Sequence, residues 1–327
     1  MNRKVSVAPM MDCTDRHERY FLRLISKNVL LYTEMIVSEA IDRGDKKKLL
    51  SFNINEKPLA LQVGGSSPKL LANAAKLGEE FGYDEINLNL GCPSKKVQKN
   101  KFGACLMKEP DLVADCLSAM QSSTKLPVTV KTRIGYDDQE DYENLYKFID
   151  KLKNTGIKTF IIHARKAMLG KFTPKQNLNI PPLKYDIVYN LKKDFKNEEI
   201  IINGGITSTD QIKTHLKKVD GVMIGRSVYH SPYFLSEIEK EIFKNNNTPS
   251  RQEVIENLIP YVKEETKKGT RLNQIMRHTL GLFHGQTGSS FWKRYLSENL
   301  CVRDADVKKI DHIMDKVKLA PQARLVG

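Results

Sequence analysis

Short apolar runs alternate along the chain with amphipathic stretches. Eight of these runs are six to nine residues long, rich in aliphatic and β-branched side chains, and bounded by turn residues or by the start of a helix, a pattern typical of buried strands. They cover residues 4–10, 30–35, 59–65, 85–91, 127–135, 159–165, 199–205 and 221–227. Between several of them, apolar residues recur at helical spacing, which predicts helices over residues 14–27, 68–82, 110–123, 141–154, 208–217 and 232–244.

Strand–helix alternation of this kind is characteristic of α/β proteins with a parallel sheet. Eight repeats within about 240 residues predict a (β/α)8 TIM barrel. The competing architecture is an open doubly wound sheet, in which a GxGxxG turn often follows the first strand. Here that turn reads APMMDCTD, so we favour the barrel. We expect the long connection after the sixth strand, with Pro181 and Pro182, to belong to its working face.

The alternation ends at a polar run, Asn245–Ser250, which is typical of a linker. Beyond it, helical periodicity without a strand signal covers residues 252–268, 272–283, 291–299 and 304–317. The sequence therefore predicts three parts, namely a barrel over residues 1–244, a linker over 245–250 and a small all-α domain over 251–327.

The composition fits a globular protein. Hydrophobic residues make up 40% of the 327 positions and charged residues 28%, enough to bury a sizeable core. No apolar run approaches the roughly 18 residues that span a membrane, and the first residues lack the apolar stretch of a secretion signal. The five cysteines are scattered without a CxxC pair, which indicates neither a disulfide framework nor a zinc site. We expect a cytoplasmic protein with no membrane segment and no obligate protein partner.

The charge balance favours a polyanionic partner. The chain has 53 Lys and Arg against 39 Asp and Glu, a net charge of +14. Three stretches, 94–108, 163–184 and 270–297, carry basic residues and no carboxylate. Each alone is typical of a solvated surface. The third also contains Trp292, the only tryptophan, and basic groups interleaved with aromatic ones suit phosphate contacts and stacking on bases or riboses of RNA.

Polar or glycine residues stand where nearly every predicted strand ends. They are Gln62, Asn87, Asn89, Lys131, Arg133, His163, Arg165, Asn203, Gly204, Gly205, Gly225 and Arg226. One strand-end Asn commonly caps a turn, and a lone His is commonly a core residue. Because all strand ends of a barrel line the same face, the set together predicts a ring of groups around one ligand.

The glycines indicate that this ligand carries a phosphate. Asn203-Gly204-Gly205 and Gly225-Arg226 follow the seventh and eighth strands, where barrels commonly bind phosphate on exposed backbone N–H groups. The sequence holds no HExxH motif, Walker loop or cluster of carboxylates for a metal. A phosphorylated cofactor without a metal fits best, namely FMN. Lys131 would then stabilise the reduced isoalloxazine, while Gln62 and His163 hold the ring.

Cys92 is the second reactive candidate. It follows the fourth strand, with Gly91 allowing close approach of the backbone and Pro93 fixing the turn. A thiol that is mostly protonated at neutral pH can donate a proton, and with a neighbouring base it can act as a nucleophile. Cys105 is the rival candidate nearby, whereas Cys116 in a helical segment fits a buried apolar role.

Several long strings resemble the tRNA-dihydrouridine synthases. They are APMMDCTDRHERYF, LALQVGGSSP, EINLNLGCPSKKVQKNKFGACLM, PVTVKTRIG, FIIHARKA, IINGGI and GVMIGR. The further strings TPKQNLNIPPLKYDIVY and RHTLGLFHGQTGSSFWKRYLSENL resemble the bacterial DusA branch, which acts on D-loop uridines 20 and 20a. The similarity covers nearly the whole chain.

The resemblance implies a barrel that holds FMN, a C-terminal helical domain that grips tRNA, and NADPH-driven reduction of a uracil C5=C6 bond. It implies hydride transfer from flavin N5 to C6 and proton transfer from Cys92 to C5. The FMN contacts implied are Pro9, Met10, Met11, Gln62, Lys131, His163, Asn203, Gly204, Gly205, Gly225 and Arg226. The tRNA contacts implied are Asn89, Lys175, Lys293 and Arg294. Leu178 departs from the family pattern, which has a basic residue at this position.

Two other functions remain open at this point. A flavin-dependent reductase of a small pyrimidine, resembling dihydroorotate dehydrogenases, would also use a barrel, Lys131 and Cys92, but it would leave the basic C-terminal part without a role. A tRNA-binding chaperone with a vestigial flavin site would bind tRNA without reducing it. We favour catalysis because the strand-end groups and Cys92 are all present.

Overall fold

The computed structural model describes residues 1–139, 141–302, 305, 307–310 and 313. It divides into two compact units. The barrel unit comprises residues 1–11 and 29–225, and the helical unit comprises residues 12–28 and the chain from 226 onward. The units thus divide the chain at other points than the domains predicted from the sequence over residues 1–244 and 251–327, which stay a prediction. Of the helix predicted over 304–317, residues 307–310 form a 3-10 turn, η4, and most of the others lie outside the described residues.

Eight parallel strands build the barrel unit. They are β1 (Val5–Val7), β2 (Leu31–Tyr32), β4 (Leu59–Gly64), β5 (Glu85–Leu90), β6 (Val128–Arg133), β7 (Thr159–His163), β8 (Glu199–Asn203) and β9 (Gly221–Ile224). Their order is β1-β9-β8-β7-β6-β5-β4-β2, and a bridge between Ser6 and Leu30 joins the first strand to the last. A short extra strand, β3 (Ile36–Val37), pairs with β4. The predicted TIM barrel is confirmed, and each predicted run contains one strand.

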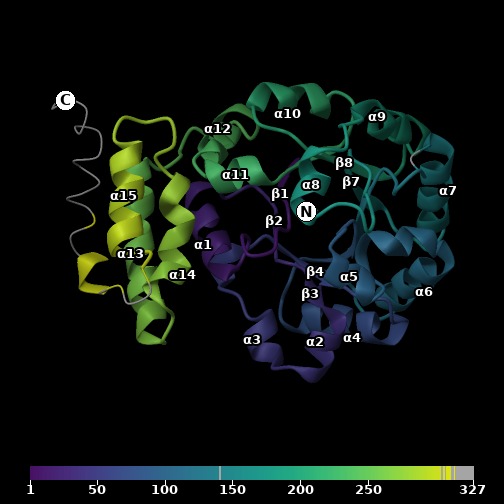
Figure 1. The fold of residues 1–327 in the computed structure, drawn as a ribbon, viewed down its shortest axis with the longest axis horizontal. Helices are drawn as coiled ribbons and strands as arrows, with labels where there is room; N and C mark the ends of the chain where they lie inside the picture. Colours follow the sequence, from purple (N-terminus) through teal and green to yellow (C-terminus); the bar gives the residue numbers. More distant parts are fainter. Residues whose placement is uncertain (140, 303–304, 306, 311–312, 314–327) are drawn as a thin grey trace. The chain divides into compact units, whose positions relative to one another are not determined.

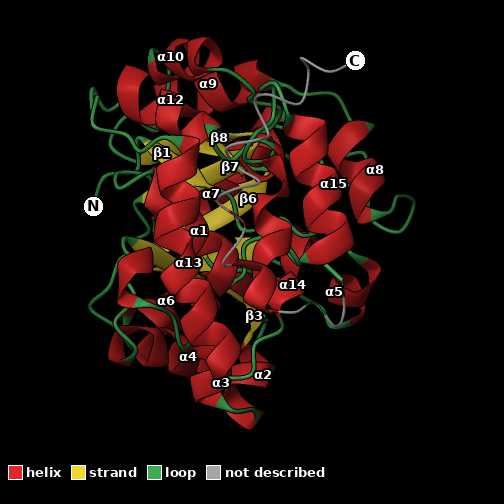
Figure 2. Ribbon diagram, turned by 90° about the vertical axis from the view of Figure 1, so that its left-hand side faces the viewer, coloured by secondary structure: helices red, strands yellow, loops and turns green. Residues whose placement is uncertain are grey.

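Helices cover the outside of this barrel (Figures 1 and 2). The longer ones are α4 (Pro68–Glu80), α6 (Pro110–Gln121), α7 (Tyr142–Lys153), α9 (Tyr185–Asp194) and α10 (Thr209–Leu216). The shorter ones are α2 (Ser38–Arg43), α3 (Lys46–Leu50), η1 (Ile54–Glu56), α5 (Lys95–Lys99), η2 (Gly103–Lys108) and α8 (Pro174–Asn179). Strands covered on both faces need apolar side chains throughout, which explains why their sequences are nearly continuous apolar runs.

The start of α4 illustrates how local sequence sets these helices. Pro68 occupies the first turn, where its missing N–H costs nothing, and Ser67 Oγ accepts from Leu70 N at 3.4 Å. By contrast, α9 was not predicted. Its N-cap, Lys184, makes no side-chain capping bond, and its short buried face includes only Val188, Tyr189 and Leu191.

The helical unit contains α1 (Arg16–Ile25), α11 (Arg226–His230), α12 (Phe234–Glu241), α13 (Arg251–Lys267), α14 (Leu272–Met276), η3 (Arg277–Gly281), α15 (Ser289–Asn299) and η4 (Val307–Ile310). Within this unit α1 packs against α13 and α14, and η3 packs against α15. A reciprocal capping box between Ser250 and Glu253 starts α13.

The expectation that Trp292 stacks on RNA is wrong. Its ring is fully buried in the helical unit, 5.0 Å from the ring of Phe283, and its Nε1 donates to Thr279 O at 3.0 Å. The next two residues, Lys293 and Arg294, are exposed on α15. Trp292 therefore anchors α15 and leaves the two basic side chains facing solvent.

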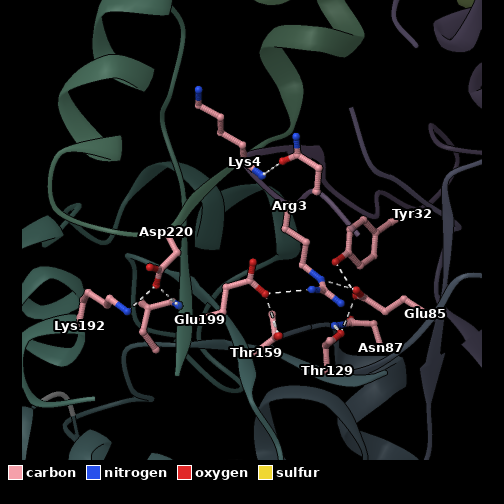
Figure 3. Close-up of polar contacts among 12 residues, drawn as sticks. Arg3, Lys4, Tyr32, Glu85, Asn87, Thr129, Thr159, Lys192, Glu199 and Asp220 are labelled. Carbon is pink, nitrogen blue, oxygen red and sulfur yellow. Dashed lines mark hydrogen bonds and ion pairs between the residues drawn. The ribbon is translucent and has the colours of Figure 1, made fainter. Parts of the chain in front are cut away.

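A buried ion pair joins the chain start to the floor of the barrel. Arg3 Nε donates to Glu85 Oε2 at 2.6 Å, and Glu85 Oε1 accepts from Tyr32 Oη and Thr129 Oγ1 at 2.6 and 2.7 Å (Figure 3). The Glu85 side chain is completely buried. A buried carboxylate of this kind is tolerated because the Arg3 cation and two hydroxyl groups donate to it.

We expect Arg3→Met to lower the free energy of unfolding by about 3–5 kcal/mol, because it leaves the Glu85 carboxylate buried and without its cation. Urea denaturation measures this change. The control is Lys76→Met, which breaks an exposed pair with Glu80 at 3.8 Å and is expected to cost at most about 1 kcal/mol. Equal losses of unfolding free energy in the two variants would contradict the stabilising role of the buried Arg3–Glu85 pair.

Candidate active site

The strand ends of the barrel unit bring five of the predicted site residues together. Gln62, Asn89, Lys131, His163 and Asn203 come from five consecutive strands, β4 to β8. The sheet register places Asn89 beside Lys131 and His163 beside Asn203. All but Lys131, which keeps some exposure, are at least nine-tenths buried. Five members of the predicted ring therefore lie at the C-terminal ends of their strands, and their binding of one common ligand stays a prediction.

Lys131 reaches across this ring from β6 to β8. Its Nζ donates to Asn203 Oδ1 at 3.0 Å, and Asn203 Nδ2 donates to Met223 O at 2.8 Å. Burial and the nearby Arg133 guanidinium lower the pKa of Lys131 to about 7, although Cys92 acts in the opposite direction. An amine in this state gains a full charge when an anionic or electron-rich group binds beside it.

The glycines after β8 are required by the backbone. Gly204 and Gly205 have φ angles of 125° and 70°, which side chains rarely adopt. A Cβ on Gly204 would also lie 2.9 Å from His163 Cδ2 and 2.8 Å from Leu183 Cδ2. After β9, a Cβ on Gly225 would lie 3.3 Å from Met10 Sδ. Glycine at positions 204 and 205 thus lets Leu183 and His163 pack directly against the main chain of the turn, and of the two glycines Gly205 is exposed.

The main chain around Cys92 is held by several hydrogen bonds. Asn89 Oδ1 accepts from the N–H groups of Gly91 and Cys92 at 3.1 and 3.0 Å, and Cys92 O accepts from Ala104 N at 2.9 Å. Arg133 Nε donates to Gly91 O at 2.8 Å. The half-buried Cys92 side chain is therefore presented by a fixed loop.

The rival cysteine has a local partner. Cys105 Sγ donates to Phe102 O at 3.1 Å, and burial raises the pKa of this thiol. Cys116 is buried on α6, as the sequence predicted, and burial raises its pKa to about 12. Of the three thiols, only Cys92 lies within electrostatic range of both Lys131 and Arg133. This arrangement favours Cys92 as the reactive thiol.

Sequence reasoning missed the roles of several polar residues of the barrel unit. Arg133 was placed in the ring, but it acts on the loops, since Nη1 donates to the carbonyls of Lys166 and Asn177 at 3.1 and 3.3 Å. Asn177 is fully buried and accepts from Met168 N through Oδ1 at 2.7 Å. In the sequence, these roles were indicated only by the presence of polar residues next to predicted site residues.

A cluster of titratable groups in the helical unit was also missed. His278 Nε2 lies 3.0 Å from the Asp15 carboxylate and His278 Nδ1 lies 3.0 Å from Glu18 Oε2, while Arg277 Nη2 is 2.7 Å from Asp15. Burial opposes the imidazolium, but the bonds to Asp15 and Glu18 prevail and raise the pKa of His278 to about 9. The His278 charge in turn holds the pKa of Asp15 low despite burial.

We expect this cluster to make stability depend on pH. A histidine whose pKa is higher in the folded than in the unfolded protein stabilises the fold. The contribution is complete below the pKa of the unfolded protein, about 6.5, and is lost as the pH rises to the folded value of about 9. Between pH 6 and 9.5, wild type should lose roughly 2–3 kcal/mol more of its unfolding free energy than His278→Gln loses. Urea denaturation of both proteins at the two pH values measures the difference. Parallel losses would show that His278 is not charged in the fold.

The chain matches the sequence profile described as dihydrouridine synthase (Dus) over residues 6–318. This match covers most of the chain. The chain belongs to the dihydrouridine synthase family. It is 54% identical over 302 residues to the tRNA-dihydrouridine(20/20a) synthase of Synechocystis sp., covering 92% of this chain and 90% of the relative.

Two further relatives of this dihydrouridine synthase carry the same name. The protein from Shewanella oneidensis is 52% identical over 313 residues, with 95% of this chain and 92% of the relative covered. The protein from Escherichia coli strain K12 is 51% identical over 316 residues, with 96% and 91% covered. The family resemblance inferred from the sequence is thereby confirmed.

The other predicted cofactor contacts of this family member lie in both units. Pro9 and Met10 are half-buried and Met11 is 55% exposed, all three in the barrel unit. Gly225 ends the barrel unit, and the exposed Arg226 begins α11 in the helical unit. These assignments stay predictions.

The predicted tRNA contacts differ in their surroundings. Lys175 is exposed on α8, and Lys293 and Arg294 are exposed on α15. Arg294 also lines a surface hollow of about 660 Å³. Asn89, in contrast, is buried with both ends of its amide bonded inside the protein. The geometry therefore favours a role for Asn89 in shaping the site, and its contact with tRNA stays a prediction.

The described residues also bear on a membrane segment and on a metal site. No helix among them is long and apolar enough to cross a membrane. Within the same part of the chain, no group of three or more His, Cys, Asp or Glu side chains could hold a metal ion.

Proposed function

We propose that this protein reduces the C5=C6 bond of uridines 20 and 20a in the D-loop of tRNA to 5,6-dihydrouridine, with FMN in the barrel mouth and NADPH as the electron donor. The observation that carries the proposal is the ring of strand-end groups around Lys131, found in a member of the dihydrouridine synthase family. Relatives more than 50% identical over more than 90% of this chain are named tRNA-dihydrouridine(20/20a) synthases, which supports the position.

The residues of the barrel mouth fit FMN. Lys131, an amine with a pKa of about 7, would interact with the electron-rich edge of the flavin, and Gln62 and His163, from β4 and β7 of the same ring, would hold it. The glycine turn at Gly204 and Gly205 follows β8, where barrels commonly bind a phosphate, and Gly205 is exposed there. Asn203, Gly225, Arg226, Pro9, Met10 and Met11 complete the proposed set. When bound, FMN supplies the hydride for C6 of the uracil.

Cys92 then has one task, which is to deliver a proton to C5. Hydride at C6 and a proton at C5 together saturate the double bond, so one acid is needed on the protein side. The thiol carries that proton and becomes a thiolate after transfer. Lys131 and Arg133 lie within electrostatic range of Cys92, and their positive charges stabilise the thiolate left behind.

The basic surfaces account for a tRNA substrate. Lys175, Lys293 and Arg294 project into solvent, and such side chains position an RNA through its phosphates. A base within a folded tRNA must leave its stack before its ring can reach a barrel mouth. We assign the exposed lysines and arginine to the backbone of the tRNA and the barrel mouth to the flipped uracil.

The experiment that tests the substrate class compares two kinds of electron acceptor, tRNA and small pyrimidines. With FMN-loaded protein, unmodified tRNA is expected to stimulate NADPH oxidation, whereas uracil and orotate are not. Absorbance at the NADPH band measures the rates. Oxidation supported by orotate but not by tRNA would replace the proposal with the small-pyrimidine reductase.

A further inference from the structure

A continuous chain of hydrogen bonds leads from the Cys92 loop into the barrel interior. The N–H groups of Gly91 and Cys92 donate to Asn89 Oδ1 at 3.1 and 3.0 Å. Asn89 Nδ2 donates to Gln62 Oε1 at 2.8 Å, and Gln62 Nε2 donates to Asn87 Oδ1 at 2.8 Å. The first half of this hydrogen-bond chain thus passes from β5 to β4 and back to β5.

The second half ends at the ion pair on the barrel floor. Asn87 Nδ2 donates to Thr129 Oγ1 at 2.8 Å, and Thr129 Oγ1 donates to Glu85 Oε1 at 2.7 Å (Figure 3). Glu85 Oε2 accepts from Arg3 Nε at 2.6 Å. The side chains of Asn87, Thr129 and Glu85 are at most 1% exposed, so water does not substitute for any of these partners.

The two ends of the chain fix the direction of every bond between them. Backbone N–H groups can only donate, and the carboxylate of Glu85, paired with Arg3, can only accept. Each amide and the Thr129 hydroxyl therefore has a single orientation in which all partners are satisfied. Bonds aligned in one direction also polarise one another, which strengthens the chain.

We propose that this chain positions the catalytic cysteine, with Glu85, Thr129 and Asn87 acting as positioning residues that orient Asn89 and, through it, the Gly91–Cys92 main chain. Glu85 is the first residue of β5 and Thr129 the second of β6, far along their strands from the ends that carry the ring. Glu85 and Thr129 therefore act on the Cys92 thiol only through the hydrogen-bond chain. This inference rests on the proposed function for the role of Cys92.

Thr129→Val tests the chain because it keeps the shape of the side chain and removes the hydroxyl. Asn87 Nδ2 then loses its acceptor and Glu85 loses one donor, so the amides of Asn87, Gln62 and Asn89 are held only from the end at the Cys92 loop. We expect kcat for dihydrouridine formation to fall about tenfold, as a small displacement of a catalytic group predicts, with KM for tRNA unchanged. We also expect faster hydrogen–deuterium exchange at Gly91 and Cys92, but not in α9, measured by mass spectrometry of the FMN-loaded protein.

Two matched variants separate positioning from general destabilisation. Thr129→Ser retains the hydroxyl and is expected to restore both kcat and slow exchange. Thr159→Val removes a hydroxyl that donates to Glu199 Oε2 at 2.9 Å on the same barrel floor (Figure 3). Glu199 also pairs with Arg3, but Thr159 itself donates to no member of the hydrogen-bond chain between Cys92 and Glu85. It is expected to leave kcat and the exchange of Gly91 and Cys92 unchanged.

Wild-type kcat and wild-type exchange in Thr129→Val would overturn the proposal, and so would equal effects of Thr159→Val. If Thr129→Val does not fold, Asn87→Leu breaks the next link and is expected to give the same two changes. The exchange measurement needs no turnover. If wild type forms no dihydrouridine, the proposed function fails, whereas faster exchange in Thr129→Val still supports the chain.

Discussion

Cys92→Ala is expected to slow dihydrouridine formation by about 10²- to 10⁴-fold, the usual contribution of a positioned general acid. The loop that presents Cys92 is held by Asn89, Ala104 and Arg133 through main-chain atoms. Removing the thiol therefore leaves the backbone conformation intact, and bound FMN and tRNA affinity should be unchanged. Single-turnover reduction of tRNA by FMN-reduced protein measures the effect on chemistry directly.

Cys105→Ala is the matched control. Cys105 is also half-buried, but its thiol donates to Phe102 O within its own loop. We expect turnover within about twofold of wild type, as for a substitution that touches no reacting group. Near wild-type turnover in Cys92→Ala, together with a severe loss in Cys105→Ala, would reverse the assignment of the two thiols.

Lys131→Met is expected to weaken FMN binding by about 10- to 100-fold, because it removes a hydrogen-bonding cation from the barrel mouth. It should also remove a pH dependence. In wild type the amine, with a pKa of about 7, is charged below pH 7 and neutral above it. If FMN binds the charged form, affinity falls as pH rises from about 7 toward the higher pKa of the bound state.

Fluorescence titrations with FMN at pH 6.5 and 8.5 measure both effects. The wild-type dissociation constant is expected to rise between the two values more than that of Lys131→Met, because the variant has no amine to titrate. Lys76→Met, which changes an exposed lysine on α4, serves as the control and should behave as wild type. A Lys131→Met protein with wild-type affinity at both pH values would remove Lys131 from the cofactor site.

The barrel and its ring of polar groups could be predicted from the sequence for one physical reason. Strands buried on both faces need apolar side chains throughout, so polar residues such as Gln62 or Lys131 at their ends stand out. The roles of those residues could not be predicted in the same way. Asn89 bonds Gln62, which is 27 positions away in the chain, and only the sheet register brings the two together.

The helical unit shows where sequence patterns mislead. Trp292 directly precedes two basic residues, a pattern that suits RNA binding, yet its ring packs inside the helical unit while Lys293 and Arg294 are exposed. The first helix, α1, follows the first barrel strand in the chain but belongs to the helical unit. Asp15, the N-cap of α1, contacts His278, which lies 263 positions away in the chain. No local periodicity reveals such a contact.

The central claim is that the substrate is the D-loop of tRNA at positions 20 and 20a. The most direct test is mass-spectrometric mapping of dihydrouridine in unmodified tRNA incubated with the protein, FMN and NADPH. A transcript with cytidine at both positions is the matched control. The account predicts dihydrouridine at 20 or 20a and none in the control transcript. Dihydrouridine at other positions in both transcripts would contradict the proposed specificity, and its absence from both, with reducible flavin in place, would contradict the proposed reaction.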